Sequence, residues 1–211
     1  MIRKVFIKLF FTFLIFTEAN SVIEVDITRG NLNPLPVAVS PLFSDENTNK
    51  NLKNNFEIIK LGEKISEVVE NNLKTTGLFN PIEKKAFLQK PDVAHLKPRF
   101  EDWALIKSQA LVTGQIKLEN EKLRVEFRLW DVLAGKEILA LAFTTVPKNW
   151  RRVGHIISDK IYERLTGEKG YFDTRIIYVA EQGPKTKRIK KLAIMDQDGF
   201  NTKYLTLGNE L

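Results

Sequence analysis

Apolar and polar residues alternate most regularly between Trp103 and Val146, and this pattern predicts three consecutive antiparallel strands. The residues on one side of the first predicted strand are apolar or small: Ala110, Val112, Gly114, Ile116 and Leu118. The other side is polar except for Leu111. A turn at residues 119–122 leads to the second strand, with Leu123, Val125, Phe127 and Leu129 on one side. After a second turn at residues 134–135, residues 138–146 are apolar on both sides, which predicts an inner strand.

Two segments with helical spacing flank these strands. Apolar residues recur every three or four positions over residues 55–76 and 150–165, with Asn149 as an N-cap for the second segment. Gly77 and Gly167 stand where left-handed C-caps would end the two helices. The sequence therefore predicts an α+β fold over residues 22–168, an α/β two-layer domain with two helices packed on a mixed sheet.

Three shorter segments complete this predicted domain. Residues 22–28 alternate as a strand, and residues 78–82 form a short strand or turn. Residues 34–41 are extended, but their prolines lack N–H donors, so we expect them at a sheet edge or only briefly inside the sheet. Residues 91–98 are expected to form an exposed connection.

The pattern changes in residues 169–211. Strands are predicted at residues 175–180, 189–195 and 204–207, and Asp198-Gly199 is a strong hairpin turn signal. No helical segment follows that could cover their apolar face. Three such strands are typical of an incomplete β-propeller blade, which needs neighbouring blades for stability.

Residues 1–21 have the layout of a secretory signal peptide. Three basic residues precede an apolar run, and Ala19 and Ser21 are small residues at the positions that a signal peptidase reads. We expect cleavage before Val22 and no stable membrane insertion afterwards, with an uncleaved anchor as the alternative. A lipoprotein signal is excluded because no cysteine follows the run.

Composition narrows the classes of function. The formal net charge is +7, with 33 basic and 26 acidic residues, but the basic residues are spread along the chain. This distribution argues against nucleic-acid binding and leaves an exported protein that binds an anionic polymer as a minor hypothesis. The absence of cysteine excludes disulfides, thiol nucleophiles and thiolate metal sites.

Residues of types that can act in catalysis are present, but they lack the partner residues that catalysis requires. The sequence of residues 196–199, Asp-Gln-Asp-Gly, is similar to the opening of a calcium loop but lacks the glutamate at position twelve, so we interpret it as a turn. His95 and His155 lack acidic partners at metal-ligand spacing, and both are expected to pack structurally, as are Trp103, Trp130 and Trp150. Ser66, Ser108 and Ser158 lack flanking glycines of a nucleophile elbow. We therefore expect no catalytic, cofactor or metal site, and no small-molecule substrate.

Seven segments, in the same order along the chain, resemble the TolB family of the Tol-Pal envelope system of Gram-negative bacteria. They are Val25–Gly30, Pro34–Val39, Thr76–Phe79, Phe100–Trp103, Ala110–Gly114, Val125–Asp131 and Phe172–Val179. The resemblance implies a periplasmic, non-enzymatic protein with an N-terminal α/β domain and a six-bladed β-propeller. It also implies that residues 195–201 form the turn of the first blade.

The resemblance implies partners as well. The start of the mature chain matches the segment that contacts the C-terminal domain of TolA in the inner membrane: Val22, Ile23, Glu24, Val25, Asp26, Ile27 and Thr28. A terminal strand can offer its edge to a partner by backbone pairing. The family binds the lipoprotein Pal through the propeller; because this chain ends after three strands of the first blade, we expect that face to be missing.

The implied role is to maintain the cell envelope, including the outer membrane, during cell division and to take part in protein import. An enzyme remains the alternative, since propellers of this kind also precede hydrolase domains. In that case the chain would be the N-terminal fragment of an exported hydrolase.

Overall fold

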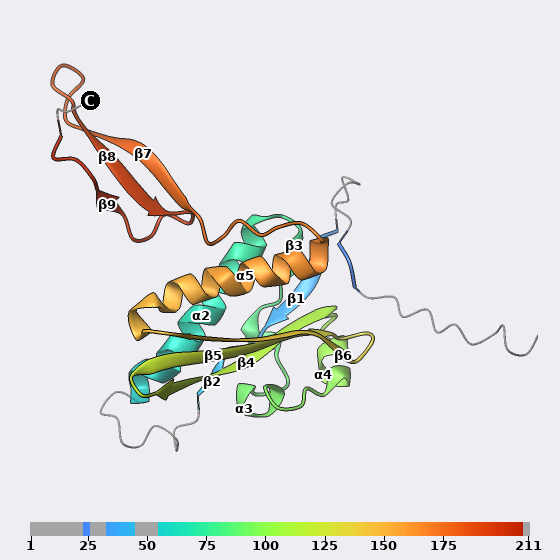
Figure 1. Cartoon of the computed structure of the whole chain (residues 1–211). Coiled ribbons are helices and arrows are strands. Elements are labelled where there is room, and N and C mark those ends of the chain that lie inside the picture. The colour runs from blue at the N-terminus through green and yellow to red at the C-terminus, as the bar shows by residue number, and fades with distance from the viewer. Residues whose placement is uncertain (1–22, 26–32, 45–54, 209–211) are drawn as a thin grey trace, which may run out of the picture.

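The computed structural model describes residues 23–25, 33–44 and 55–208, which form two sheets and the helices that cover the larger one (Figure 1). The larger, six-stranded sheet has the order β3-β1-β4-β5-β6, and β2 pairs with β4. Its strands are β1 (Leu35–Val39), β2 (Phe43–Ser44), β3 (Phe79–Pro81), β4 (Ala110–Glu119), β5 (Lys122–Asp131) and β6 (Lys136–Thr145). Pairs of β1 and β2 are parallel and the β4–β5–β6 pairs are antiparallel, which confirms the predicted mixed sheet.

The meander predicted from residue alternation is confirmed, together with its turns. Asn120 and Glu121 alone separate β4 from β5, and both have positive φ angles, of 49° and 63°. Such backbone angles match the twist of a two-residue hairpin. The second turn ends at Gly135, where φ is 62°.

The proline-rich strand β1 lies inside the sheet but pairs over only three residues on each side, so of the two predicted alternatives the edge position is wrong and the brief entry into the sheet is confirmed. It pairs with β3 on one side and β4 on the other. Pro36 precedes Val37, the first residue of β1 that pairs with β4, and its carbonyl accepts from the backbone N–H of Gln109 at 3.0 Å. The missing N–H of Pro36 therefore falls before the β1–β4 ladder begins and does not interrupt it.

Strand β6 was predicted as an inner strand, and this prediction is wrong because, among the described strands, β6 lies at the edge and pairs only with β5. Its two sides differ in exposure: Leu139, Leu141 and Phe143 pack against the core, whereas Ala140 and Ala142 are exposed. Alanine is small enough to tolerate either environment, which is why the sequence pattern looked apolar on both sides.

Helices α2 (Asn55–Thr75) and α5 (Trp150–Thr166) cover one face of this sheet, as predicted (Figure 1). Their apolar side chains join those of the strands in the main core, which includes Ile65, Leu73, Phe127 and Ile157. Gly167 ends α5 in the left-handed conformation with φ of 75°. Asn149 is the N-cap residue of α5, as predicted, but its side chain makes no capping bond, because its amide donates to Thr145 Oγ1 at 3.1 Å.

Short helices partly cover the opposite face: α3 (Pro91–Ala94) and α4 (Phe100–Leu105), preceded by a 3-10 turn at Lys84–Ala86. Trp103 therefore belongs to α4 rather than to the meander, and residues 91–98 are not the fully exposed connection that was predicted, since Ala94 and His95 are buried. Leu111 and Ala38 pack with Trp103 in a second, smaller core. This packing explains why Leu111 interrupts the polar side of β4.

The C-terminal residues form a separate antiparallel sheet of β7 (Arg175–Gln182), β8 (Ile189–Asp196) and β9 (Lys203–Tyr204), which stands to one side of the larger sheet (Figure 1). The three strands predicted as an incomplete blade are thus confirmed. Several of its large apolar side chains are exposed, among them Ile177, Val179, Tyr204 and Leu207. No helix in the described part of the chain is long and apolar enough to cross a membrane.

Candidate functional site

The predicted partner-binding segment is described at Ile23, Glu24 and Val25, whereas Val22, Asp26, Ile27 and Thr28 lie outside the described residues. The cleavage residues Ala19 and Ser21 lie outside them too. Residues 23–25 join neither sheet, so the strand predicted here is absent from its described part. Ile23 and Val25 pack against the main core, and Glu24 is exposed.

One hydrogen bond holds the beginning of this segment to the end of β5. The backbone N–H of Ile23 donates to Oδ2 of Asp131 at 3.2 Å. The other carboxylate oxygen of Asp131 accepts from the backbone N–H of Ala134 at 2.9 Å. Asp131 is 2% exposed, so one buried carboxylate fixes both the β5–β6 turn and the N-terminal segment.

A second hydrogen bond holds the segment to the C-terminal end of α5. The backbone N–H of Val25 donates to the carbonyl of Leu165 at 2.7 Å. The last four carbonyls of a helix have no partner within the helix, and Leu165 is in that last turn. The segment therefore supplies a hydrogen-bond donor to a carbonyl at the C-terminal end of α5 and lies across that end.

An apolar groove of about 580 Å³ adjoins the segment, between α5 and the edge strand β6. Ile23, Leu139 and Leu141 supply its apolar lining, and charged residues supply the rest: Glu24, Lys160, Glu163 and Arg164. Lys160 and Glu163 form an ion pair at 2.7 Å on the rim. The groove thus combines an apolar floor with backbone groups of an edge strand.

A β-bulge modifies this edge. Leu129 pairs with Leu139 and Trp130 pairs with Glu137, which leaves Ile138 as the extra residue of β6. The Nε–H of Arg164 donates to the carbonyl of Ile138 at 3.0 Å. The bulge and this bond occupy part of the edge and reduce uncontrolled pairing with other chains.

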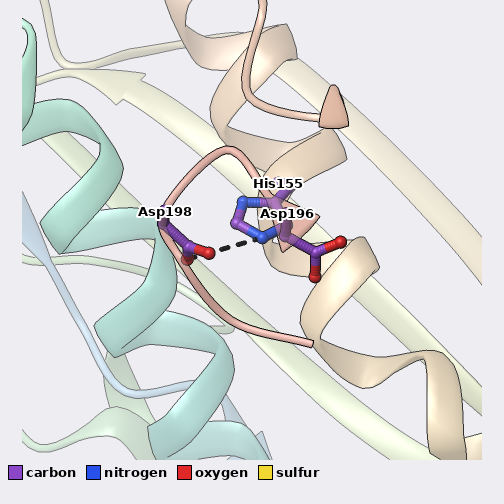
Figure 2. Close-up of side chains that lie close together, drawn as sticks. All are labelled: His155, Asp196 and Asp198. Carbon is purple, nitrogen blue, oxygen red and sulfur yellow. Dashed lines mark ion pairs between the residues drawn. The ribbon is translucent and has the colours of Figure 1, made fainter. Parts of the chain in front are cut away.

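The structure also brings together three residues that the sequence did not connect: His155 on α5, Asp196 at the end of β8 and Asp198 in the β8–β9 turn (Figure 2). Their ligand-type atoms all lie within 4.8 Å of one another, and His155 Nε2 is 3.6 Å from Asp198 Oδ2. Asp198 also pairs with Arg151, and Gln197 Nε2 donates to Asn72 Oδ1 at 3.1 Å. The sequence predicts only a turn at residues 196–199, yet this turn also joins the second sheet to α2 and α5.

Burial lowers the pKa of His155, and Arg151 lowers it further, whereas the nearby Asp198 raises it. The direction of the net change shows that desolvation outweighs the attraction of Asp198. The imidazole is therefore neutral at pH 7. A neutral imidazole with two carboxylates is a ligand set known in metal sites, so the hydrogen positions decide whether this cluster can hold a metal.

The hydrogen-bond chain around His155 supports one assignment of those positions, with the Asn72 amide nitrogen as the donor to the ring. Ser158 Oγ donates to the carbonyl of Gly154 at 2.8 Å, so it accepts from Asn72 Nδ2 at 2.9 Å. The same amide nitrogen lies 2.9 Å from His155 Nδ1 and can only donate to it. Nδ1 is consequently the acceptor and Nε2 carries the hydrogen, so the atom that faces the aspartates is not a metal-binding lone pair.

The other candidate residues serve packing. His95 is 8% exposed, stacks on Phe43 with ring centroids 4.4 Å apart, and its Nδ1 lies 3.0 Å from the carbonyl of Pro91. Ser66 and Ser108 donate to backbone carbonyls. Trp103 is buried, and its Nε1 donates to Gln89 Oε1 at 3.0 Å.

Trp130 and Trp150 are half-buried against the two cores, so all three tryptophans pack as predicted.

Comparisons with known proteins agree with one another. The family model of the TolB amino-terminal domain matches residues 23–138. Over 204 residues, the chain is 74% identical to the Tol-Pal system protein TolB of Pelagibacter ubique (strain HTCC1062), which covers 96% of this chain and 46% of that protein. The crystal structure of TolB from Acinetobacter baumannii matches with a TM-score of 0.64 and 26% identity, covering 83% of this chain and 39% of that one. The chain thus spans about half the length of the curated relative.

Proposed function

This chain belongs to the TolB family, and on that basis we propose that it is a non-enzymatic, periplasmic component of a Tol-Pal system. We propose that residues 22–28 bind the C-terminal domain of TolA and so link the inner membrane to partners at the outer membrane and peptidoglycan. This linkage would maintain the envelope during cell division. The removal of residues 1–21 during export belongs to the same proposal.

The observation that carries the proposal is the way residues 23–25 are attached. Two backbone N–H groups of this segment, those of Ile23 and Val25, donate to the body, and the segment is part of neither sheet. Because the N–H groups of Ile23 and Val25 point to the body, a partner strand would pair with the backbone groups of the residues between and after them, beginning with Glu24. Exposed Glu24 alternates with apolar Ile23 and Val25, so side chains on one side can set the register.

The serine environments favour binding over catalysis. Ser66, Ser108 and Ser158 each donate to a backbone carbonyl, and Ser158 is separated from His155 by the amide of Asn72. A serine hydrolase of the triad type would need a serine that donates directly to a histidine base. None of the three serines weighed as nucleophiles has that arrangement.

Calorimetry with the purified C-terminal domain of TolA tests the proposal. The mature chain should bind, and deletion of residues 22–33 should remove the heat of binding. As a matched control, scrambling the sequence of residues 184–188 in the β7–β8 loop should leave the affinity unchanged, because that loop is exposed and belongs to the other sheet. Equal affinity of the deletion variant would exclude this segment as the binding site.

A further inference from the structure

A polar cleft of about 590 Å³ lies between α5 and the β7–β9 sheet, apart from the proposed partner segment. Five of its lining side chains are cationic: Lys148, Arg151, Arg152, Arg175 and Lys203. Two are acidic, Asp173 and Asp196. The lining therefore carries an excess of three positive charges, which Asp198 behind it reduces to two.

The carboxylates of this region each pair with an arginine. Asp173 accepts from Arg152 through both oxygens, at 3.0 and 3.1 Å from Nε. Asp198 pairs with Arg151, and Asp196 lies 3.8 Å from Arg175. Within the described residues, this leaves the ammonium groups of Lys148 and Lys203 as the cations of the cleft without a carboxylate partner.

Two buried N–H donors in the lining make no hydrogen bond within the described part of the protein, and the carboxylate oxygen of Asp198 stays 3.6 Å from one of them. They are Nε of Arg151 and Nε2 of His155, whose side chain is only 3% exposed. Arginine nitrogens can only donate, and the Asn72 network makes His155 Nε2 a donor as well. A buried donor without an acceptor is unfavourable, so both atoms favour a ligand that supplies oxygen lone pairs.

We propose that this cleft binds a small oxyanion, a phosphate or carboxylate group, which accepts from Arg151 Nε and His155 Nε2 and is attracted by Lys148 and Lys203. A metal cation does not fit this arrangement. Its ligand position on His155 is occupied by hydrogen, and the surrounding charge is positive.

An oxyanion would also join the two sheets. Arg151 and His155 belong to α5, whereas Lys203 belongs to β9 and Asp198 to the β8–β9 turn. The guanidinium of Arg151 lies 3.5 Å from the centroid of the Phe200 ring, so the same arginine already contacts both parts. Occupancy of the cleft should therefore stabilise the contact between the α/β body and the second sheet.

Nuclear magnetic resonance on the mature chain with ¹⁵N-labelled histidine tests this proposal, because the chain has only two histidines. Inorganic phosphate and citrate are added separately, which distinguishes a phosphate site from a carboxylate site. The anion that the cleft accepts should shift the Nε2 signal of His155 saturably and leave that of His95 unchanged. No saturable shift with either anion up to about 20 mM would overturn the proposal. So would a shift produced by Zn²⁺ in the absence of any response to anions.

Two double variants distinguish anion binding at this cleft from attraction by the net charge of the protein. Lys148→Gln with Lys203→Gln should weaken binding of the active anion by roughly threefold to tenfold, since both ammonium groups face the cleft. Lys122→Gln with Lys187→Gln removes the same charge from exposed positions outside the lining and should leave binding unchanged. Equal weakening by both pairs would mean that net charge, and not this cleft, attracts the anion.

Discussion

Ile23 and Asp131 are separated by 108 residues in the sequence, and the backbone N–H of Ile23 donates to Asp131 Oδ2 at 3.2 Å. This bond fixes the place at which the N-terminal segment meets the body. Because Asp131 also accepts from Ala134, the position of the segment is coupled to the β5–β6 turn. A change at this one carboxylate should therefore affect both.

Asp131→Ala should lower the free energy of unfolding by about 2–3 kcal/mol, because the backbone N–H groups of Ile23 and Ala134 lose a charged acceptor. Urea denaturation measures the change. The control is Asp92→Ala, at an exposed position on α3, which should change stability by less than about 0.5 kcal/mol. Similar stability of the two variants would show that Asp131 does not anchor the segment.

Gly154 allows the two long helices to approach each other closely. A Cβ at this position would lie 2.8 Å from Val68 Cγ1 and 2.9 Å from Val68 Cβ. Gly154→Ala should therefore destabilise the protein by about 1–3 kcal/mol, although alanine is the better helix former. Adding Val68→Ala should restore part of the loss, and a double-mutant cycle in urea measures this coupling. If the effects of the two substitutions on stability were purely additive, the added methyl group would not clash with Val68.

Stability should fall as the pH drops below 6.5 because of His155. Burial lowers the pKa of this side chain in the folded protein below its ordinary value of 6.5, so the unfolded chain binds a proton more readily than the folded protein as the pH falls. The contribution is fully present well above pH 6.5 and decreases as the pH falls through this value. Carboxylates such as Glu126, whose pKa is lowered from its ordinary value of 4.5 by Gln115 and Arg124, lose their contribution at lower pH.

Thermal unfolding at a series of pH values measures this effect, with His155→Gln as the comparison. The variant should be less stable at pH 7, because glutamine does not reproduce the bond to Asn72, but its stability should vary less as the pH drops below 6.5. Parallel pH profiles of the two proteins would show that another group causes the decrease.

Trypsin should cut the β7–β8 loop before it cuts the connection between α5 and β7. The loop offers exposed Lys185, Lys187 and Arg188. In the connection, Phe172 is fully buried, and the backbone N–H groups of Phe172 and Asp173 donate to the carboxylate of Asp159 at 2.6 and 3.1 Å. Mass spectrometry of early digests should therefore show cleavage within residues 185–188 before cleavage at Lys169.

The opposite order would mean that the second sheet separates readily from α5. It would favour the boundary near residues 167–171 that the sequence pattern suggests.

Local signals in the sequence predicted the meander and both long helices. Alternation fixes which side of β4 and β5 faces the core, and Gly167 marks the end of α5 because its φ is positive. The position of β1 could not be predicted in the same way. Whether Pro36 interrupts a ladder depends on where β4 begins to pair, and that register is set by residues about 70 positions later.

The second candidate site was beyond sequence reasoning for a related reason. His155 lies about 40 residues before Asp198, and no fixed spacing connects them. They meet because the β8–β9 turn packs against α2 and α5, with Gln197 bonded to Asn72. The sequence identified both histidine and turn, but the contact between the two parts of the chain is a tertiary effect.

We propose above that residues 22–28 pair their backbone with the C-terminal domain of TolA. Hydrogen–deuterium exchange of the mature chain, with and without that domain, is the decisive measurement. Alternate amides within residues 22–28 should exchange at least about tenfold more slowly in the complex, since pairing protects every second N–H. Binding that leaves exchange in these residues unchanged, with protection elsewhere, would contradict the account.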